Sequence, residues 1–281
     1  MNKKFKIILG YILLFLESII LFTITTLVVY RLTLFDKSYI KKELSKNDYY
    51  KKMNEEIKTE MSFYTEQSGF EDSVLDDIFT LTDIRNTTNS FITNIYNGQV
   101  YNISTNIIEE KLNKNINNYI QKENFKVVNQ DEINKFTKQI SKVYSDEIKL
   151  MGYLDKVCKY IPKVKGLIEY AVVGLFALLV ALIIINEKAF KRRDYSVVLF
   201  TSAFLIICTL IFFTDRIDVK NLLVYSKTVS GLVISIIHNL SLFFILIAIL
   251  YIIIGIVIIL LKKEKKHSHR HSHKHSHERV N

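Results

Sequence analysis

The chain has no histidine before His238, although it holds seven histidines among its 281 residues. Catalysis by a serine or cysteine paired with a histidine is therefore excluded from residues 1–237. The sequence also lacks a His-Glu-x-x-His motif, a Gly-x-Ser-x-Gly motif, a Walker loop and a glycine-rich dinucleotide turn. Without these motifs, nothing in the chain predicts an enzyme or a bound cofactor.

Cysteine, proline and tryptophan are also scarce. The two cysteines are Cys158, ahead of the second apolar run, and Cys208, inside the third. Because they lie in different environments we do not expect them to pair, which excludes a disulfide framework. Cys158 could bridge two copies in an oxidising exterior, although an unreacted thiol is the simpler expectation. The single proline, the absence of tryptophan and the many Asn, Ile, Lys and Tyr residues are typical of an AT-rich genome and suggest a Gram-positive bacterium.

Four long apolar runs divide the chain, at residues 7–30, 166–185, 196–213 and 241–261. A helix needs about 20 apolar residues at 1.5 Å rise to cross the hydrocarbon core, so each run is long enough or nearly so. The first run is about twice the usual apolar length of a signal peptide and lacks a small-x-small cleavage site. We therefore interpret it as an uncleaved anchor, with a signal peptide as the alternative.

The formal net charge of +10 is confined to three short segments, residues 1–6, 186–195 and 262–281, whereas residues 31–165 are close to neutral. Because Lys and Arg accumulate in cytoplasmic loops, both termini are predicted to be cytoplasmic and residues 31–165 extracytoplasmic, in the plasma membrane of a bacterium. The cytoplasmic segments are too short to fold as an effector domain. The basic charge therefore indicates topology and contact with the lipid bilayer, and no nucleic acid partner is expected.

Apolar residues between the first two runs recur at the three- and four-residue spacing of amphipathic helices. The clearest series is Tyr50, Met53, Ile57, Met61 and Tyr64, and it stops before Ser68 and Gly69.

Further helices are predicted over Val74–Phe79, from a cap at Thr82 to Asn97, after Thr105, and after Asn129, which has the spacing of a capping box with Glu132. About 130 residues can bury one core. The predicted fold class is an all-α integral membrane protein with four transmembrane helices and an all-helical extracytoplasmic domain over residues 31–165.

Residues 214–240 are predicted to form an outer loop, because the fourth span needs only the last 20 or so residues of a longer apolar region. Part of this loop has an apolar helical face, made by Leu222, Tyr225, Val229, Leu232, Val233 and Ile236. This face predicts an amphipathic helix on the outer leaflet. A single long, tilted helix that includes the fourth span is the other interpretation.

Glu17 lies near the middle of the first apolar run. An ionisable group at that depth costs about 2.5–3.5 kcal/mol on insertion scales, which makes it a candidate functional residue. One interpretation is a carboxylate that binds a proton or cation. The favoured one is a protonated Glu that hydrogen-bonds a neighbouring helix. Polar side chains of the third run are its expected partners: Thr201, Ser202, Cys208 and Thr209.

Most of the histidines alternate with small or basic residues in the tail, at His267, His269, His271, His273, His275 and His277. Neutral imidazoles bind zinc, nickel and copper, so weak metal binding by a disordered tail over residues 262–281 is expected. The tail has no defined ligand spacing, and Arg270 and Lys274 repel a cation. The alternative is a basic tail that lies against the anionic inner leaflet.

Three other polar features are expected to have no special function. His238, at the outer boundary of the fourth span, could sense pH but needs no such role there. Asp215 and Arg216 mark the end of the third span. The acidic residues near Asp72 lack the ligand pattern of an EF-hand loop and are expected to form a solvated helix face.

Two segments carry a resemblance to a known group of proteins. They read Gln-Ser-Gly-Phe-Glu-Asp-Ser-Val-Leu-Asp-Asp-Ile-Phe over residues 67–79 and Phe-Ile-Thr-Asn-Ile-Tyr-Asn-Gly over residues 91–98. The chain resembles four-span membrane proteins of low-GC Gram-positive bacteria, a group without a known activity. The resemblance implies one N-terminal span, a helical external domain and three closing spans, and it supplies no site residues.

The leading functional hypothesis is a non-enzymatic plasma-membrane protein whose extracytoplasmic domain serves in sensing or protein interaction. Any signal would pass through a membrane or cell-envelope partner, or through the tail. The alternative is a small transporter or metal-handling protein that uses Glu17 and the histidine tail. A membrane-embedded enzyme is disfavoured, because no set of catalytic groups converges.

Overall fold

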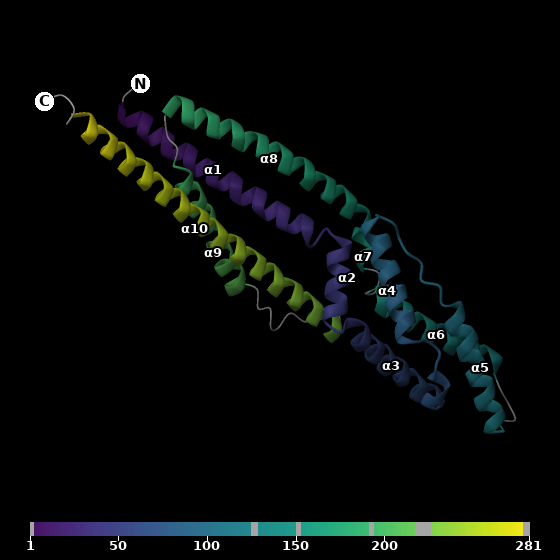
Figure 1. Ribbon diagram of the computed structural model, residues 1–281. Coiled ribbons are helices and arrows are strands. Elements are labelled where there is room, and N and C mark those ends of the chain that lie inside the picture. Colours follow the sequence, from purple (N-terminus) through teal and green to yellow (C-terminus); the bar gives the residue numbers. More distant parts are fainter. Residues whose placement is uncertain (1–2, 125–128, 150–152, 191–193, 217–225, 278–281) are drawn as a thin grey trace. The chain divides into compact units, whose positions relative to one another are not determined.

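The computed structural model describes the backbone of residues 3–124, 129–149, 153–190, 194–216 and 226–277 (Figure 1). Every regular element among these residues is a helix, so the predicted all-α class is confirmed for the described part of the chain.

Four helices contain the apolar runs. They are α1 (Lys3–Leu32), α8 (Ile161–Phe190), α9 (Tyr195–Arg216) and α10 (Lys227–His277). Each is long and apolar enough to cross a membrane, which confirms the prediction of four such helices. All four are longer than the apolar runs themselves, because nothing in the flanking residues interrupts the backbone hydrogen bonds of the helix.

The chain divides into two compact units. The membrane unit consists of residues 1–31, 167–221 and 237–281, and it holds nearly all of the apolar runs. The globular unit consists of residues 32–166 and 222–236. Apart from the addition of residues 222–236, the globular unit is the segment in which the sequence predicts a separate helical domain.

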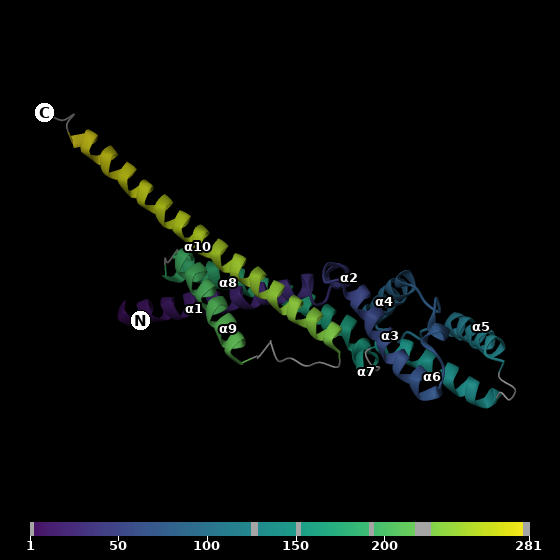
Figure 2. The same ribbon diagram turned by 90° about the horizontal axis from the view of Figure 1, so that it is seen from below.

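The globular unit is built from short and medium-length helices. In chain order they are α2 (Lys37–Lys46), α3 (Tyr49–Ser68), the 3-10 turn η1 (Asp72–Leu75), α4 (Leu81–Tyr96), α5 (Asn106–Lys122), α6 (Gln130–Lys149), α7 (Tyr153–Val157) and the 3-10 turn η3 (Cys158–Tyr160). Helix α3 packs on α6, α4 and η1, and α5 packs on α6 and η1. Both views show α3 beside α4 and α6 (Figures 1 and 2).

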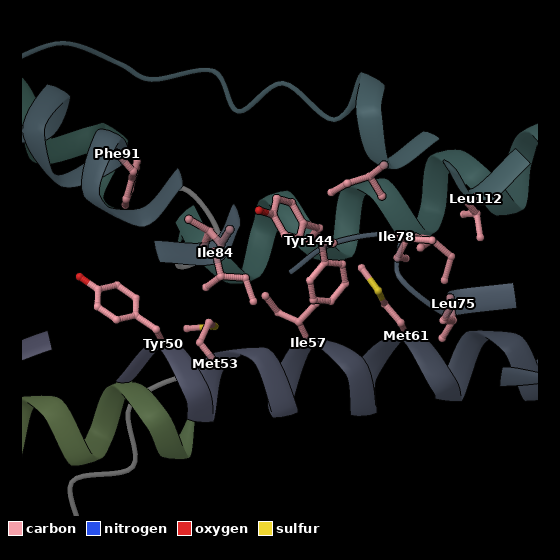
Figure 3. Packing of buried hydrophobic residues seen from close by; sticks show 14 of the residues in the cluster. Tyr50, Met53, Ile57, Met61, Leu75, Ile78, Ile84, Phe91, Leu112 and Tyr144 are labelled. Atoms are coloured by element: carbon pink, nitrogen blue, oxygen red, sulfur yellow. The ribbon is translucent and has the colours of Figure 1, made fainter. Parts of the chain in front are cut away.

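The core of the globular unit is the apolar face of α3 together with the faces that pack on it. Met53, Ile57 and Met61 of α3 are fully buried, as the spacing predicts. Figure 3 shows them pointing toward Ile84 of α4 and Tyr144 of α6. Burying a side chain of this size contributes about 1.5–3 kcal/mol, so this face accounts for much of the stability of the unit.

Local signals define most of the helix ends. Helix α3 ends at Ser68, followed by Gly69 at φ 73°, and α4 ends before Asn97 and Gly98, as predicted. The predicted cap of α4 at Thr82 is wrong. Thr80 is the N-cap, because its hydroxyl accepts from the N–H of Asp83 while the carboxylate of Asp83 accepts from the N–H of Thr80, a reciprocal pair that Thr82 cannot form.

Helix α10 decides between the two interpretations of the last apolar region. It is one continuous helix from Lys227, so the single long helix is correct and the separate interfacial helix is wrong (Figure 2). Val229 is buried in the core of the globular unit, and Leu232 and Val233 pack against that core. The described part of the amphipathic face therefore packs on protein, which sequence periodicity cannot distinguish from a lipid surface, while Leu222 and Tyr225 lie outside the described residues.

The backbone of α10 remains helical to His277, whereas the sequence predicts a disordered tail from residue 262. Residues 262–277 contain neither proline nor glycine, so the helix meets no residue that would end it. The side chains of residues 263–281 lie outside the described part of the structure.

Candidate functional site

Helix α1 makes a polar contact with each of the other three long helices. Asn186 of α8 donates to Glu17 Oε1 at 3.1 Å, and the Ser202 hydroxyl of α9 donates to the Ser18 carbonyl at 3.0 Å. Thr25 shares a hydrogen bond with the hydroxyl of Tyr251 on α10. In an apolar medium, hydrogen bonds and close packing hold helices together, because lipid tails are as apolar as the side chains. Helix α1 is thus the helix to which α8, α9 and α10 each form a hydrogen bond.

Glu17 pairs with a residue that the sequence places outside the spans. The expected partners were polar residues of the third run, but the carboxyl contacts Asn186, which was assigned to the loop over residues 186–195. The assignment failed because α8 continues to Phe190, four residues after Asn186. Glu17 and Asn186 are each only 1% exposed.

The other expected partners of Glu17 have different contacts. Besides bonding Ser18, the Ser202 hydroxyl lies 2.8 Å from the Val198 carbonyl, and Thr209 donates to the Leu205 carbonyl of its own helix. Cys208 is exposed. No hydrogen bond from these residues to Glu17 occurs in the described part of the chain.

The register between α1 and α8 shows which part of α8 lies beside Glu17. At the other end of the contact, Arg31 forms an ion pair with Glu169 at 2.6 Å, and the two helices run antiparallel between the two contacts. The 14 residues from Glu17 to Arg31 span about 21 Å of helix. Asn186 directly precedes Glu187 and Lys188, so Glu17 lies level with the charged end of α8 and not with its middle.

An apolar cavity of about 170 Å³ lies between α1, α9 and α10. The aliphatic hydroxyls in its lining belong to Thr26, Thr209 and Ser241, and each donates to a carbonyl of its own helix. Tyr30 is the fourth lining residue with a hydroxyl, so this cavity offers a mainly apolar surface to a solute.

A groove of about 600 Å³ with a mixed lining lies on the globular unit and is hereafter called the α3–α5–α6 groove. It is formed by the end of α3, the end of α5 and the beginning of α6. Its lining residues are Gln67, Ser68, Gly69, Phe70, Tyr119, Ile120, Asn129, Glu132, Ile133, Lys135, Phe136 and Gln139.

The lining of the groove combines aromatic residues with polar residues. Phe70 packs against Tyr119 and Phe136, with ring centroids 6.0 and 5.0 Å apart. The polar lining includes three side-chain amides and the opposite charges of Glu132 and Lys135, so the groove carries no net charge. Apolar surface with a few hydrogen-bonding groups is the usual composition of a ligand site, and 600 Å³ is within the usual size range of about 300–1,000 Å³. The sequence indicated the helix faces but not their meeting point, because it gives no register between helices.

The histidine prediction falls on side chains outside the described residues. His267, His269, His271, His273, His275 and His277 belong to α10 by their backbone, and their metal binding stays a prediction. Within the described residues, no group of three or more His, Cys, Asp or Glu side chains could hold a metal ion.

The remaining polar features have ordinary surroundings. His238 is an exposed residue of α10. Asp72 accepts a hydrogen bond from Thr65, which ties η1 to α3. Cys158 is buried and its thiol donates to the Asp155 carbonyl, and both cysteines are free, as expected. Burial of Cys158 disfavours a disulfide between two copies of the chain.

We compared the chain with protein-family models, with curated proteins and with solved structures, and none of them matches it.

Proposed function

We propose that the chain is a non-enzymatic, multi-pass protein of a bacterial plasma membrane, and that its globular unit binds a partner protein outside the cell. The observation that carries this proposal is the α3–α5–α6 groove, an open site with mixed lining on the globular unit. Four helices that are apolar enough to span a membrane support the multi-pass part.

The distribution of charge supports an external globular unit. The basic segments lie at both termini and between the second and third spans, and the segment between the first two spans is close to neutral. Positive charge is retained on the cytoplasmic side during insertion, so this pattern favours cytoplasmic termini and an extracytoplasmic globular unit.

The chemistry of the groove favours a protein segment as its ligand. Side-chain amides such as Gln67 and Gln139 can both donate to and accept from peptide groups, and the aromatic rings in the lining can contact apolar side chains. A neutral groove does not favour a polyanion such as nucleic acid. The partner we propose is a membrane or cell-envelope protein, which would also carry any signal across the membrane.

Charge reversal within the groove tests this proposal. Lys135→Glu alters the lining of the groove on α6, and Lys58→Glu makes the same change on an exposed residue of α3 outside the groove. Full-length protein is crosslinked in membranes of its source and then purified. We expect one specific partner to be recovered with the parent chain and with Lys58→Glu, and to be lost with Lys135→Glu.

Thermal unfolding of both variants serves as the control for folding, because exposed substitutions change stability by only about 0.5 kcal/mol. Recovery of lipid and the chain itself alone, or equal recovery of the partner with both variants, would contradict the proposal.

A further inference from the structure

The contact between Glu17 and Asn186 leaves one polar atom without a partner. Asn186 Nδ2 donates to Glu17 Oε1, but Asn186 Oδ1 is buried and has no hydrogen-bond partner in the described part of the chain. A buried amide oxygen without a donor is costly, and native structures contain few of them. A group that donates a hydrogen bond to Asn186 Oδ1 is therefore required.

Neighbouring hydroxyls do not supply this donor. The Ser18 hydroxyl donates to the Leu14 carbonyl at 2.8 Å, and the Ser202 hydroxyl has the Ser18 and Val198 carbonyls as its acceptors. A hydroxyl carries only one proton to donate. Both protons are thus already used.

Among the described residues, the charged groups near the contact do not neutralise a carboxylate at Glu17. At the Asn186 end of α8 these are the half-buried Glu187 and the exposed Lys188, whereas Lys163, Lys165 and Glu169 lie toward the other end of the helix. Residues 196–213 of α9 and 241–261 of α10 contain no charged residue, and α1 contains none between Lys6 and Arg31 except Glu17 itself. No ion pair of Glu17 is found among the described residues. A buried carboxylate without a cation is strongly disfavoured.

We propose that Glu17 and Asn186 form a proton-binding site between α1 and α8. The Glu17 carboxyl group is protonated, and its O–H donates to Asn186 Oδ1 while the same carboxyl group accepts from Asn186 Nδ2. The acid and the amide thereby close a ring of two hydrogen bonds. One proton taken from water neutralises the carboxylate and satisfies the orphaned amide oxygen at once.

Loss of this proton would weaken the contact between the two helices. The O–H donor disappears, a carboxylate oxygen then faces the amide oxygen, and a negative charge remains in a site that is 1% exposed. In the chain, helix α1 precedes and helix α8 follows the longer segment of the globular unit, so proton binding at this site acts on the two helices that flank this segment in sequence.

Infrared spectroscopy of the full chain in lipid nanodiscs at pH 7 tests the proposal. A protonated carboxyl group has a C=O stretching band that ionised carboxylates lack, and we expect this band in the parent spectrum. It should disappear in Glu17→Gln and persist in Glu169→Gln, which removes an ion-paired carboxylate of the same unit. Identical carboxyl regions in the parent and Glu17→Gln spectra would overturn the proposal.

Isotope labelling provides a second measurement that does not depend on how a variant folds. Carbon-13 in the glutamate side chains must shift the protonated band of the parent protein, and the same label in aspartate must leave the band in place. A shift with labelled aspartate and none with labelled glutamate would assign the proton to an aspartate and contradict the proposal.

Melting temperatures distinguish a ring of two hydrogen bonds between Glu17 and Asn186 from a single hydrogen bond. Glu17→Gln should leave the melting temperature unchanged, because a Gln amide can also donate to Oδ1 and accept from Nδ2. Glu17→Leu and Asn186→Leu should each lower it by a few degrees, and the double variant should recover most of the loss, because removing both partners leaves no orphan. A large loss in Glu17→Gln would show that the carboxyl group does not donate.

Discussion

The two units of this chain are held together by opposite kinds of side chain. In the globular unit the interior is mainly apolar, with a few buried polar residues such as Thr88 and Ser141, and most charged residues face outward. In the membrane unit most surfaces are apolar, and the specific contacts of α1 with its neighbours are polar. Burial from water stabilises the first unit, whereas lipid offers no such gain to the second. Apolar residues therefore determine the packing of the unit surrounded by water, and polar residues provide specific contacts in the unit surrounded by lipid.

Truncating a buried core residue should show the largest difference between the two units in the effect of a mutation on stability. Ile57→Ala removes a fully buried side chain of the globular unit and should reduce its free energy of unfolding by about 2–5 kcal/mol, because it leaves a cavity. Ile107→Ala, at a residue 67% exposed on α5, is the matched control. Val173→Ala, at a residue 69% exposed on α8, extends the control to the membrane unit.

Thermal or denaturant unfolding of the full chain measures all three. Both controls should change stability by less than about 0.5 kcal/mol. If Val173→Ala were as costly as Ile57→Ala, its side chain would be packed against protein, and the contrast between the units would fail.

Adding a side chain should reveal where the membrane unit is tightly packed. A Cβ on Gly255 of α10 would lie 2.8 Å from the ring of Phe200 on α9, whereas a Cβ on Gly174 of α8 would have no neighbour within 4 Å. Gly255→Leu should therefore cost about 1–3 kcal/mol through overpacking. Gly174→Leu should cost nothing measurable in the same unfolding experiment in detergent. Equal effects would contradict the close contact between α9 and α10.

Alkaline unfolding should affect the globular unit through Tyr96. Its hydroxyl donates to the Leu34 carbonyl at 2.6 Å, and burial, with a smaller effect of Asp36, raises its pKa to about 12. Because the pKa is raised on folding from its ordinary value of 10, the stabilisation is fully present below pH 10 and is lost as the pH rises toward 12. At pH 7, Tyr96→Phe should cost about 0.5–1.5 kcal/mol by removing the hydrogen bond.

Melting curves at pH 8 and pH 11 check this prediction. The parent chain should lose more stability than Tyr96→Phe over that interval. Parallel losses in the two proteins would show that Tyr96 is not responsible for the alkaline transition.

Sequence patterns predicted the helices of the globular unit better than their contacts. The series Met53, Ile57 and Met61 predicted a buried face, because only one side of a helix in water can be apolar. The cap at Thr80 was missed although the sequence signals it: Asp83 follows Thr80 at the spacing of a capping box, whereas the residue three positions after Thr82 is Arg85.

In the membrane unit the same patterns identified the spans but not the partner of Glu17. Helices surrounded by lipid are apolar on every side, so periodicity does not show which face meets which neighbour. Asn186 was overlooked because it lies next to Glu187, where the apolar run ends. The groove was unpredictable for a related reason: it depends on how three helix ends come together, and no local signal encodes this.

The separation of Glu17 from Asn186 along the chain has a consequence for biosynthesis. The two residues are 169 positions apart, and a ribosome adds about 5–20 residues per second. Asn186 is therefore synthesised roughly ten to thirty seconds after Glu17. During this time the Glu17 side chain of α1 has no hydrogen bond from Asn186, and this bond can form only once α8 has been made. The order of synthesis thus makes α8 the helix that supplies the missing hydrogen-bond partner of Glu17.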